Sequence, residues 1–242
     1  MSSIAQYIDH AVLHPTQTDD DLRAACEMCA DLGAASVCVK PYMIPLAAEY
    51  LAGSRTLVST VIGFPHGGAA TETKAAEATL ACRQGARELD MVINVGRALA
   101  REWDYVEMEI RAVVTAAQHG GAIVKVILET GLIPDDEIKR TLCQISEHSG
   151  AAFVKTSTGF GYLKGPDGKL IATGATEHDI RLMRDACGSA MGVKASGGIR
   201  TLAEARNFIA LGATRLGTSA TQSLVAEERN SPPAPSDSQS DY

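Results

Sequence analysis

The chain is poor in aromatic residues and has no excess of positive charge. Aromatic residues make up 5% of its 242 positions, and 22 Lys and Arg stand against 29 Asp and Glu, a net charge of −7. Non-specific binding to nucleic acid or to anionic membranes needs a basic face, so the composition argues against both kinds of partner. Apolar residues at 45% and charged residues at 21% are close to the globular average, which excludes disorder of the whole chain.

Long hydrophobic runs are also missing. No segment approaches the roughly 20 consecutive apolar residues of a membrane-spanning helix. Residues 1–6 show neither the basic start nor the apolar stretch of a secretory signal. We therefore expect a cytoplasmic protein without a membrane segment.

Cysteine and histidine are present, but their spacing does not suit a metal site. Of the six cysteines, only Cys26 and Cys29 form a close pair, and a structural zinc site normally needs a second Cys or His pair. His10 and His14 are four residues apart, but no third ligand has partner spacing. We expect reduced thiols and no bound metal.

Short apolar segments rich in β-branched residues alternate with amphipathic segments. Strands are predicted over 7–13, 36–40, 57–63, 88–94, 123–129, 152–158, 192–196 and 214–218. Helices are predicted over 19–32, 69–85, 103–119, 134–149, 176–187 and 201–211. Eight such units favour an α/β fold that closes as a (β/α)8 TIM barrel over a doubly wound sheet, and no dinucleotide-binding G-x-G-x-x-G follows the first strand.

Two segments lie outside this alternation. Residues 161–170 contain Gly-Pro-Asp-Gly, a strong turn signal, and predict an exposed hairpin-like insertion. Residues 230–242 are polar and rich in Pro and Ser, which predicts a disordered tail. The predicted organisation is one barrel domain over 1–229 and a flexible C-terminal tail over 230–242.

Charged residues interrupt the predicted strands. They are Asp9, Glu88, Asp90, Lys125, Glu129, Lys155 and Lys194. Side chains alternate along a strand, so Lys155 shares a face with Ser157, and Lys194 with Ser196. We expect lysines and carboxylates to converge on one barrel interior. Because charged side chains are rarely buried unless they are paired or functional, this interior is the candidate site.

Two lysines on neighbouring strands have a chemical consequence. A second ammonium group and partial desolvation both lower the pKa of an amine, and such an amine is a nucleophile toward carbonyl groups. The alternative is a structural salt-bridge network lining the barrel, for which Lys125 and Glu129 are the better candidates. The pattern alone does not say which lysine is the nucleophile.

Glycines end the last two predicted strands. Gly197 and Gly198 follow one strand, and Gly217 and Ser219 occupy the corresponding place in the next. Exposed backbone N–H groups at successive strand-to-helix turns bind anions, and barrels commonly hold a phosphate after strands seven and eight. These residues therefore predict a phosphate cradle, with two tight turns of no special function as the alternative.

An ordered set of motifs runs along most of the chain. They occupy 8–10, 37–41, 61–67, 88–94, 125–130, 153–160, 193–200 and 215–219. Together they resemble the deoxyribose-phosphate aldolases, a family of class I, Schiff-base-forming aldolases. No single motif is decisive, whereas the complete set in this order is highly specific.

The resemblance implies a role for each matching residue. Lys155 would form the Schiff base, and Lys194 would perturb its pKa and join in proton transfer. Asp90 would relay protons through water, with Asp9 as a supporting acid beneath. The implied phosphate cradle is Gly197, Gly198, Gly217 and Ser219.

The family cleaves 2-deoxy-D-ribose 5-phosphate reversibly to acetaldehyde and D-glyceraldehyde 3-phosphate, a step of deoxyribose phosphate catabolism. The reaction uses no metal and no organic cofactor. Expected partners are the sugar phosphate, the aldehydes and further copies of the chain in a homo-oligomer, with no nucleic acid and no membrane. The residues alone leave two other classes open: a sugar-phosphate isomerase and a non-catalytic phosphometabolite-binding barrel.

Two positions need separate expectations. Some relatives end in tyrosine, as this chain does at Tyr242, which implies a proton donor brought in by the tail; an incidental tyrosine is the alternative. Phe160 follows Gly159 where some relatives carry a basic residue. Phosphate would then rest mainly on backbone N–H groups.

Other reactive side chains have structural interpretations. Cys38 is expected on a strand facing the barrel, where burial alone explains it. Glu107 and Glu109 are expected on a solvated helix face.

Overall fold

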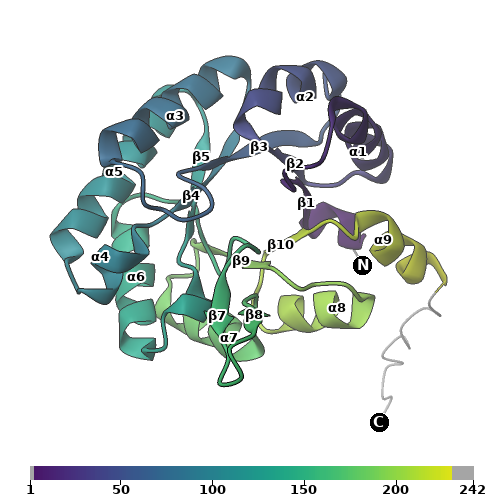
Figure 1. The fold of residues 1–242 in the computed structure, drawn as a ribbon. Helices are drawn as coiled ribbons and strands as arrows, with labels where there is room; N and C mark the ends of the chain where they lie inside the picture. Colours follow the sequence, from purple (N-terminus) through teal and green to yellow (C-terminus); the bar gives the residue numbers. More distant parts are fainter. Residues whose placement is uncertain (1–2, 231–242) are drawn as a thin grey trace, which may run out of the picture.

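Eight parallel strands close into a barrel surrounded by helices (Figure 1). The computed structural model describes residues 3–230, and within them the barrel strands follow the order β1-β10-β9-β6-β5-β4-β3-β2. The strands are β1 Ile8–Val12, β2 Ser36–Val39, β3 Leu57–Ile62, β4 Glu88–Val92, β5 Ile123–Ile127, β6 Phe153–Lys155, β9 Gly192–Ser196 and β10 Arg215–Thr218. The predicted (β/α)8 barrel is confirmed.

Helices connect the strands on the outside of the barrel. They are α1 Asp19–Leu32, α2 Ile44–Tyr50, α3 Thr71–Gln84, α4 Val95–Leu99, α5 Trp103–His119, α6 Asp136–His148, α7 Glu177–Ala186, α8 Leu202–Ala210 and α9 Thr221–Asn230, with 3-10 turns at Ile4–Tyr7, Pro41–Met43 and Thr130–Leu132. Thr18 and Thr201 each form a capping box at the start of a helix, which satisfies backbone N–H groups that have no partner within the helix.

The predicted strands and helices are present; 19–32, 103–119 and 192–196 match the predicted bounds, and the others are shorter at one or both ends. The strand predicted over 152–158 ends at Lys155. Helices α2, α4 and α9 were not predicted; α2 and α4 are short, and α2 contains Pro45 in its first turn. Helix α9 runs through Asn230, the first residue of the predicted tail. The remainder of that prediction, residues 231–242 with Tyr242, lies outside the described residues.

Apolar and charged side chains occupy opposite faces of the strands. Leu89 and Met91 of β4, like Val124 and Val126 of β5, belong to the apolar core that packs between the barrel and its helices. The alternate positions point into the barrel and include buried charged groups such as Asp90. The apolar core thus supports the barrel from outside, and the interior is left for polar chemistry. No helix within residues 3–230 is long and apolar enough to cross a membrane.

Glu109 departs from expectation. It is fully buried on α5, where its Oε2 lies 2.7 Å from Lys74 Nζ of α3 and its Oε1 accepts a hydrogen bond from the backbone N–H of Asn94. The prediction of a solvated face is therefore wrong for Glu109. The reason is its position on the inner face of α5, beside the core residues Val106 and Ile110.

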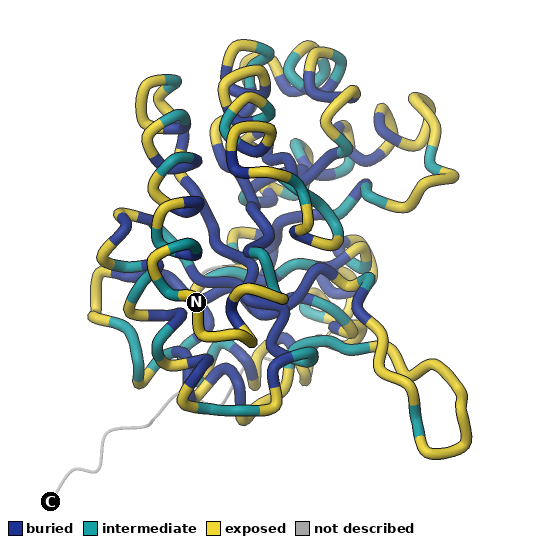
Figure 2. Tube along the Cα trace, turned by 60° about the vertical axis from the view of Figure 1, so that its left-hand side comes forward, coloured by how far each residue is buried: buried dark blue, intermediate teal, exposed yellow. Residues whose placement is uncertain are grey.

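The insertion after β6 forms an antiparallel hairpin that projects from the barrel. Its strands are β7 Tyr162–Lys164 and β8 Leu170–Ala172, and all six residues are exposed, as Figure 2 shows. At its base, the backbone N–H of Thr173 donates to the carbonyl of Gly161 at 2.9 Å. The predicted exposed hairpin is present and extends two residues beyond the expected 161–170.

Candidate active site

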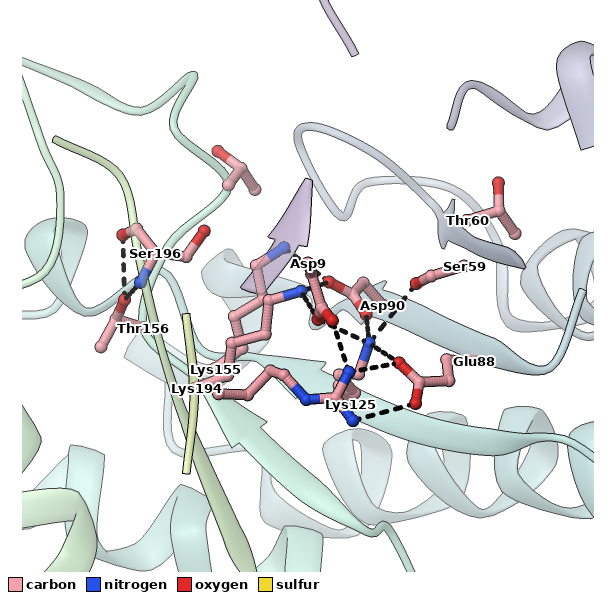
Figure 3. A network of polar contacts seen from close by, with 12 residues as sticks. Asp9, Ser59, Thr60, Glu88, Asp90, Lys125, Lys155, Thr156, Lys194 and Ser196 are labelled. Atoms are coloured by element: carbon pink, nitrogen blue, oxygen red, sulfur yellow. Dashed lines mark hydrogen bonds and ion pairs between the residues drawn. The ribbon is translucent and has the colours of Figure 1, made fainter. Parts of the chain in front are cut away.

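Lysines from the neighbouring strands β6 and β9 meet two carboxylates inside the barrel (Figure 3). Lys155 Nζ and Lys194 Nζ each lie 2.7 Å from Asp90 Oδ2. Lys194 Nζ also lies 2.5 Å from Asp9 Oδ2. The two lysines are register partners across β6 and β9, and all four side chains are buried. The structure thus brings together the residues whose convergence side-chain alternation predicted.

A second layer of charges lies toward the N-terminal ends of the strands. Lys125 Nζ lies 2.6 Å from Glu88 Oε2, 2.9 Å from Asp90 Oδ1 and 3.0 Å from Asp9 Oδ2. Arg215 pairs with Glu88 at 2.9 Å and also with Asp9. Sequence reasoning missed Arg215, although it has the same strand parity as Gly217, which lines the cavity above it. Lys125 belongs to this supporting layer, as expected.

Within the part of the chain that the structure describes, the network holds more cations than carboxylates. Its cations are Lys125, Lys155, Lys194 and Arg215, and its carboxylates are Asp9, Glu88 and Asp90. If every group were ionised, one positive charge would be uncompensated in a buried site, which is costly. Among residues 3–230, Lys155 contacts a single carboxylate, that of Asp90, and shares it with both other lysines. Lys155 is therefore the amine that loses its proton most readily.

The shifts in pKa follow the same asymmetry. Burial lowers the pKa of Lys155, the Lys194 ammonium lowers it further, and Asp90 offsets only part of this. Burial also acts to lower the pKa of Lys194, but Asp9 and Asp90 outweigh it and the net direction is upward. Lys125, Lys155 and Lys194 hold the pKa of Asp90 well below its ordinary value against the opposing effect of burial. The pKa values of the two neighbouring lysines are therefore shifted in opposite directions, downward for Lys155 and upward for Lys194.

A cavity of about 350 Å³ opens above the two lysines at the C-terminal ends of the strands. Lys155, Lys194 and Asp9 lie among its lining residues. The same cavity is lined by all four predicted cradle residues, Gly197, Gly198, Gly217 and Ser219. The amine of Lys155 and the predicted anion site thus face one cavity, at the end of the barrel where active sites of this fold occur.

The local backbone explains the paired glycines. Gly197 and Gly198 have φ of 91° and 85°, which side-chain-bearing residues rarely adopt. A Cβ at Gly217 would lie 2.6 Å from Ser196 Oγ. These positions keep side chains out of the cavity wall and leave backbone atoms facing it, as anion binding by N–H groups requires.

The other sequence candidates fall into two groups. Cys38, Phe160 and His14 line the cavity, and the ring of Phe160 packs edge-on against Phe64 with centroids 5.4 Å apart. His10 does not line it: its Nδ1 lies 2.9 Å from Thr221 Oγ1, and burial lowers its pKa to about 4.

Metal-ligating side chains do not gather. Across residues 3–230, no group of three or more His, Cys, Asp or Glu side chains is placed to hold a metal ion. Cys26 and Cys29 are buried, and burial raises the pKa of each thiol to about 12. Both behave as small core residues.

A (β/α)8 barrel with a buried lysine pair beneath a glycine-lined cavity has the parts of an aldolase. The family model described as DeoC/LacD family aldolase matches residues 3–220. This chain belongs to that family.

Similar proteins support the assignment. The chain is 48% identical over 222 residues to deoxyribose-phosphate aldolase 1 of Bacillus licheniformis, covering 92% of this chain and 94% of the relative. It is 47% identical over 226 residues to deoxyribose-phosphate aldolase 1 of Cutibacterium acnes, covering 93% and 98%. The structure of deoxyribose phosphate aldolase from Aeropyrum pernix, described as tetrameric, superposes with a TM-score of 0.83 at 31% identity, covering 94% of this chain and 91% of the other.

Proposed function

We propose that this protein cleaves 2-deoxy-D-ribose 5-phosphate reversibly to D-glyceraldehyde 3-phosphate and acetaldehyde through a Schiff base on Lys155. The observation that carries the proposal is the unequal environment of the two lysines. Lys155 shares one carboxylate and faces the cavity, whereas Lys194 contacts both Asp9 and Asp90. The names of the relatives from Bacillus licheniformis and Cutibacterium acnes supply the substrate.

The first half of the mechanism forms the imine. Neutral Lys155 Nζ attacks the aldehyde carbon of the open-chain sugar, giving a carbinolamine. The Lys194 ammonium and Asp90 stand within hydrogen-bond distance of one another beside Lys155, so they supply the proton with which the hydroxyl leaves as water. The resulting protonated imine is the electron sink for carbon–carbon cleavage.

The second half breaks the C2–C3 bond. A base removes the proton of the C3 hydroxyl; we assign this to Asp90, acting through a water molecule. The bonding electrons flow into the imine, glyceraldehyde 3-phosphate leaves, and an enamine remains on Lys155. Protonation at C2 and hydrolysis release acetaldehyde and regenerate the amine.

Binding of the phosphate group would orient the substrate in the cavity. Backbone N–H groups of the cradle residues would hold the phosphate away from the reacting bond, so that binding energy positions the aldehyde over Lys155. Phe160 contributes no charge at the cavity wall. Phosphate recognition would therefore rest on the backbone of Gly197, Gly198, Gly217 and Ser219.

Trapping the imine tests the function and the assignment together. Incubation with acetaldehyde and sodium borohydride should add one C2H4 unit at Lys155, located by peptide mass spectrometry. A Lys194→Met protein, which keeps Lys155, serves as a control: any label that it takes up should again be at Lys155. Labelling at Lys194 or Lys125 would overturn the assignment, and an unlabelled protein would favour an isomerase or a non-catalytic phosphometabolite-binding barrel.

We also propose that the chain works as a homo-oligomer. The relative from Aeropyrum pernix is described as tetrameric. Sedimentation equilibrium of the full chain should give a mass of two or more subunits; a monomer at micromolar concentration would contradict this.

A further inference from the structure

Glu129 occupies an unusual position between the barrel and the hairpin. It follows the end of β5, is 3% exposed, and has φ of 55°, a left-handed conformation that is uncommon for a residue with a side chain. A backbone conformation of this kind is sterically unfavourable, and it persists where the surrounding structure holds the residue in place. The strand predicted over 123–129 did not anticipate this turn.

The carboxyl group of Glu129 lies against the first leg of the hairpin base. Its Oε2 accepts the backbone N–H of Thr158 at 3.1 Å. Its Oε1 has no hydrogen-bond partner among residues 3–230, and the same is true of the buried Thr173 Oγ1. A Cβ at Gly161 would lie 3.0 Å from Glu129 Oε1 and 2.5 Å from Thr173 Oγ1. Both polar atoms therefore approach the same glycine.

The first leg of the hairpin, which Glu129 contacts at Thr158, forms part of the cavity wall, and the second leg packs against Gly197. One leg of the hairpin is residues 158–161, in which Thr158 Oγ1 accepts the N–H of Phe160, and residues 158–160 line the cavity. The other leg is residues 173–175. There, the N–H of Ala175 donates to the carbonyl of Gly197 at 3.2 Å, and a Cβ at Gly174 would lie 2.6 Å from the same oxygen.

Burial and charge favour a hydrogen-bonding role over an ionic one. Burial raises the pKa of Glu129, although its bonds to Thr158 and the charges of Lys155 and His66 oppose the shift. No ion pair involves Glu129 within the described part of the chain. The group is thus placed to join neutral partners.

We propose that Glu129 is a positioning residue that clamps the first hairpin leg, 158–161, beside the second leg, 173–175, and the cradle glycine Gly197, and so sets the affinity for the phosphate end of the substrate. This rests on the proposed aldolase function. Glu129 would not contact the reacting carbon. Its effect would reach the substrate through the placement of the cavity wall, so it should depend on whether the substrate carries a phosphate.

The test compares two substrates in two variants. For Glu129→Ala, kcat/KM for 2-deoxyribose 5-phosphate should fall about tenfold, mainly through KM, while kcat/KM for unphosphorylated 2-deoxyribose changes by less than about twofold. Glu129→Gln should recover most of the loss, because its amide oxygen can still accept from Thr158. Equal losses for both substrates would overturn the proposal, as would an unchanged phosphate preference in Glu129→Ala.

A second variant keeps the test decisive if Glu129→Ala does not fold. Gly161→Ala places a methyl group against Glu129 and Thr173 and should raise KM for the phosphorylated substrate alone. Asp167→Ala, at the exposed far end of the hairpin, is the matched control and should match the wild type. A wild-type protein without aldolase activity would contradict the proposed function; an active wild type with unaltered KM in Gly161→Ala would contradict only the clamp.

Discussion

Two buried groups of lysine and carboxylate in this barrel differ in how their charges are shared. Lys74 has its own carboxylate, that of Glu109 at 2.7 Å, and also donates to the carbonyl of Val92. Lys155 has the same 2.7 Å contact with Asp90, but that carboxylate also serves Lys125 and Lys194. Distance and burial are alike in the two cases, so neither explains why one lysine would react.

The two lysines differ in how many cations share their carboxylate and in whether they face the cavity. Lys74 and Glu109 neutralise each other away from the cavity, and Glu109 also accepts the N–H of Asn94. Lys155 faces the cavity in a network with one cation too many. A buried lysine becomes a candidate nucleophile when its carboxylate is divided among several cations and a carbonyl compound can reach it.

The largest expected effect is the loss of activity when Lys155, the lysine that faces the cavity, is replaced. Lys155→Ala should lower kcat for cleavage by about four orders of magnitude, because no amine remains to form the imine. Acetaldehyde release measures this, with circular dichroism to confirm folding. Retained activity in a folded Lys155→Ala protein would assign the chemistry to another group.

For Lys74, which is paired with Glu109, we expect a loss of stability rather than a loss of activity. Lys74→Met leaves Glu109 buried without a counter-ion and should reduce the free energy of unfolding by about 3–5 kcal/mol, with kcat of the folded protein nearly unchanged. Urea unfolding measures the loss, and Lys74→Met/Glu109→Leu should recover part of it. If the folded single variant were inactive, the distinction between the two groups would fail.

The same variant has a defined pH dependence. Burial already raises the pKa of Glu109 above its ordinary value, and removing Lys74 raises it further. A group whose pKa is higher in the folded state stabilises the fold at low pH, and this contribution is lost as pH rises through the folded pKa. The loss of stability of Lys74→Met relative to the wild type, measured at each pH, should therefore grow as pH rises from acidic toward neutral and alkaline values. A difference from the wild type that grew toward acid instead would contradict this assignment.

Lys194→Leu tests how far Lys194 lowers the pKa of its neighbour Lys155. Removing this ammonium, and freeing Asp90 to pair with Lys155, should raise the pKa of Lys155 by about one unit or more. The basic limb of imine formation, followed by borohydride trapping across pH, should move upward accordingly. An unchanged limb with lost activity would mean that Lys194 acts only in proton transfer.

The smallest effect concerns Tyr242. Because Lys155 faces an open cavity, a proton donor from elsewhere in the chain could reach it. The fully buried Lys74–Glu109 pair offers no such access. Deletion of Tyr242 should lower kcat, or proton exchange into acetaldehyde, by about tenfold without changing the melting temperature. Rates equal to those of the full chain would show that Tyr242 has no part in the reaction.

Local rules predicted much of this molecule. β-Branched runs predicted the barrel strands, and strand alternation placed Lys155, Lys194 and Asp90 in one interior, since each rule needs only neighbouring residues. The resemblance to the aldolase family added the roles. Which lysine is the less protonated depends on Asp9, from a strand far away in the sequence, and alternation alone did not specify that neighbour.

The errors share a cause in long-range packing. Glu109 was expected in solvent because its partner Lys74 lies 35 residues away on another helix. Glu129 was placed on the strand with Lys125, but β5 ends at Ile127, and the turn that follows brings Glu129 to the hairpin base. Packing between elements decided both positions. For Glu109 the neighbouring apolar residues Val106 and Ile110 on the same helix face were a signal of burial, whereas the residues around Glu129 carry no such signal.

The closed base of the hairpin makes this insertion a separable module. The backbone bond from Thr173 to Gly161 joins the two legs before the chain departs into β7 and β8. Evolution can therefore lengthen, shorten or exchange residues 162–172 without changing the path of the chain beside the cavity. The same junction offers protein engineers a graft point, where a foreign loop could be brought to the rim of a catalytic barrel while the strand that carries Lys155 stays in register.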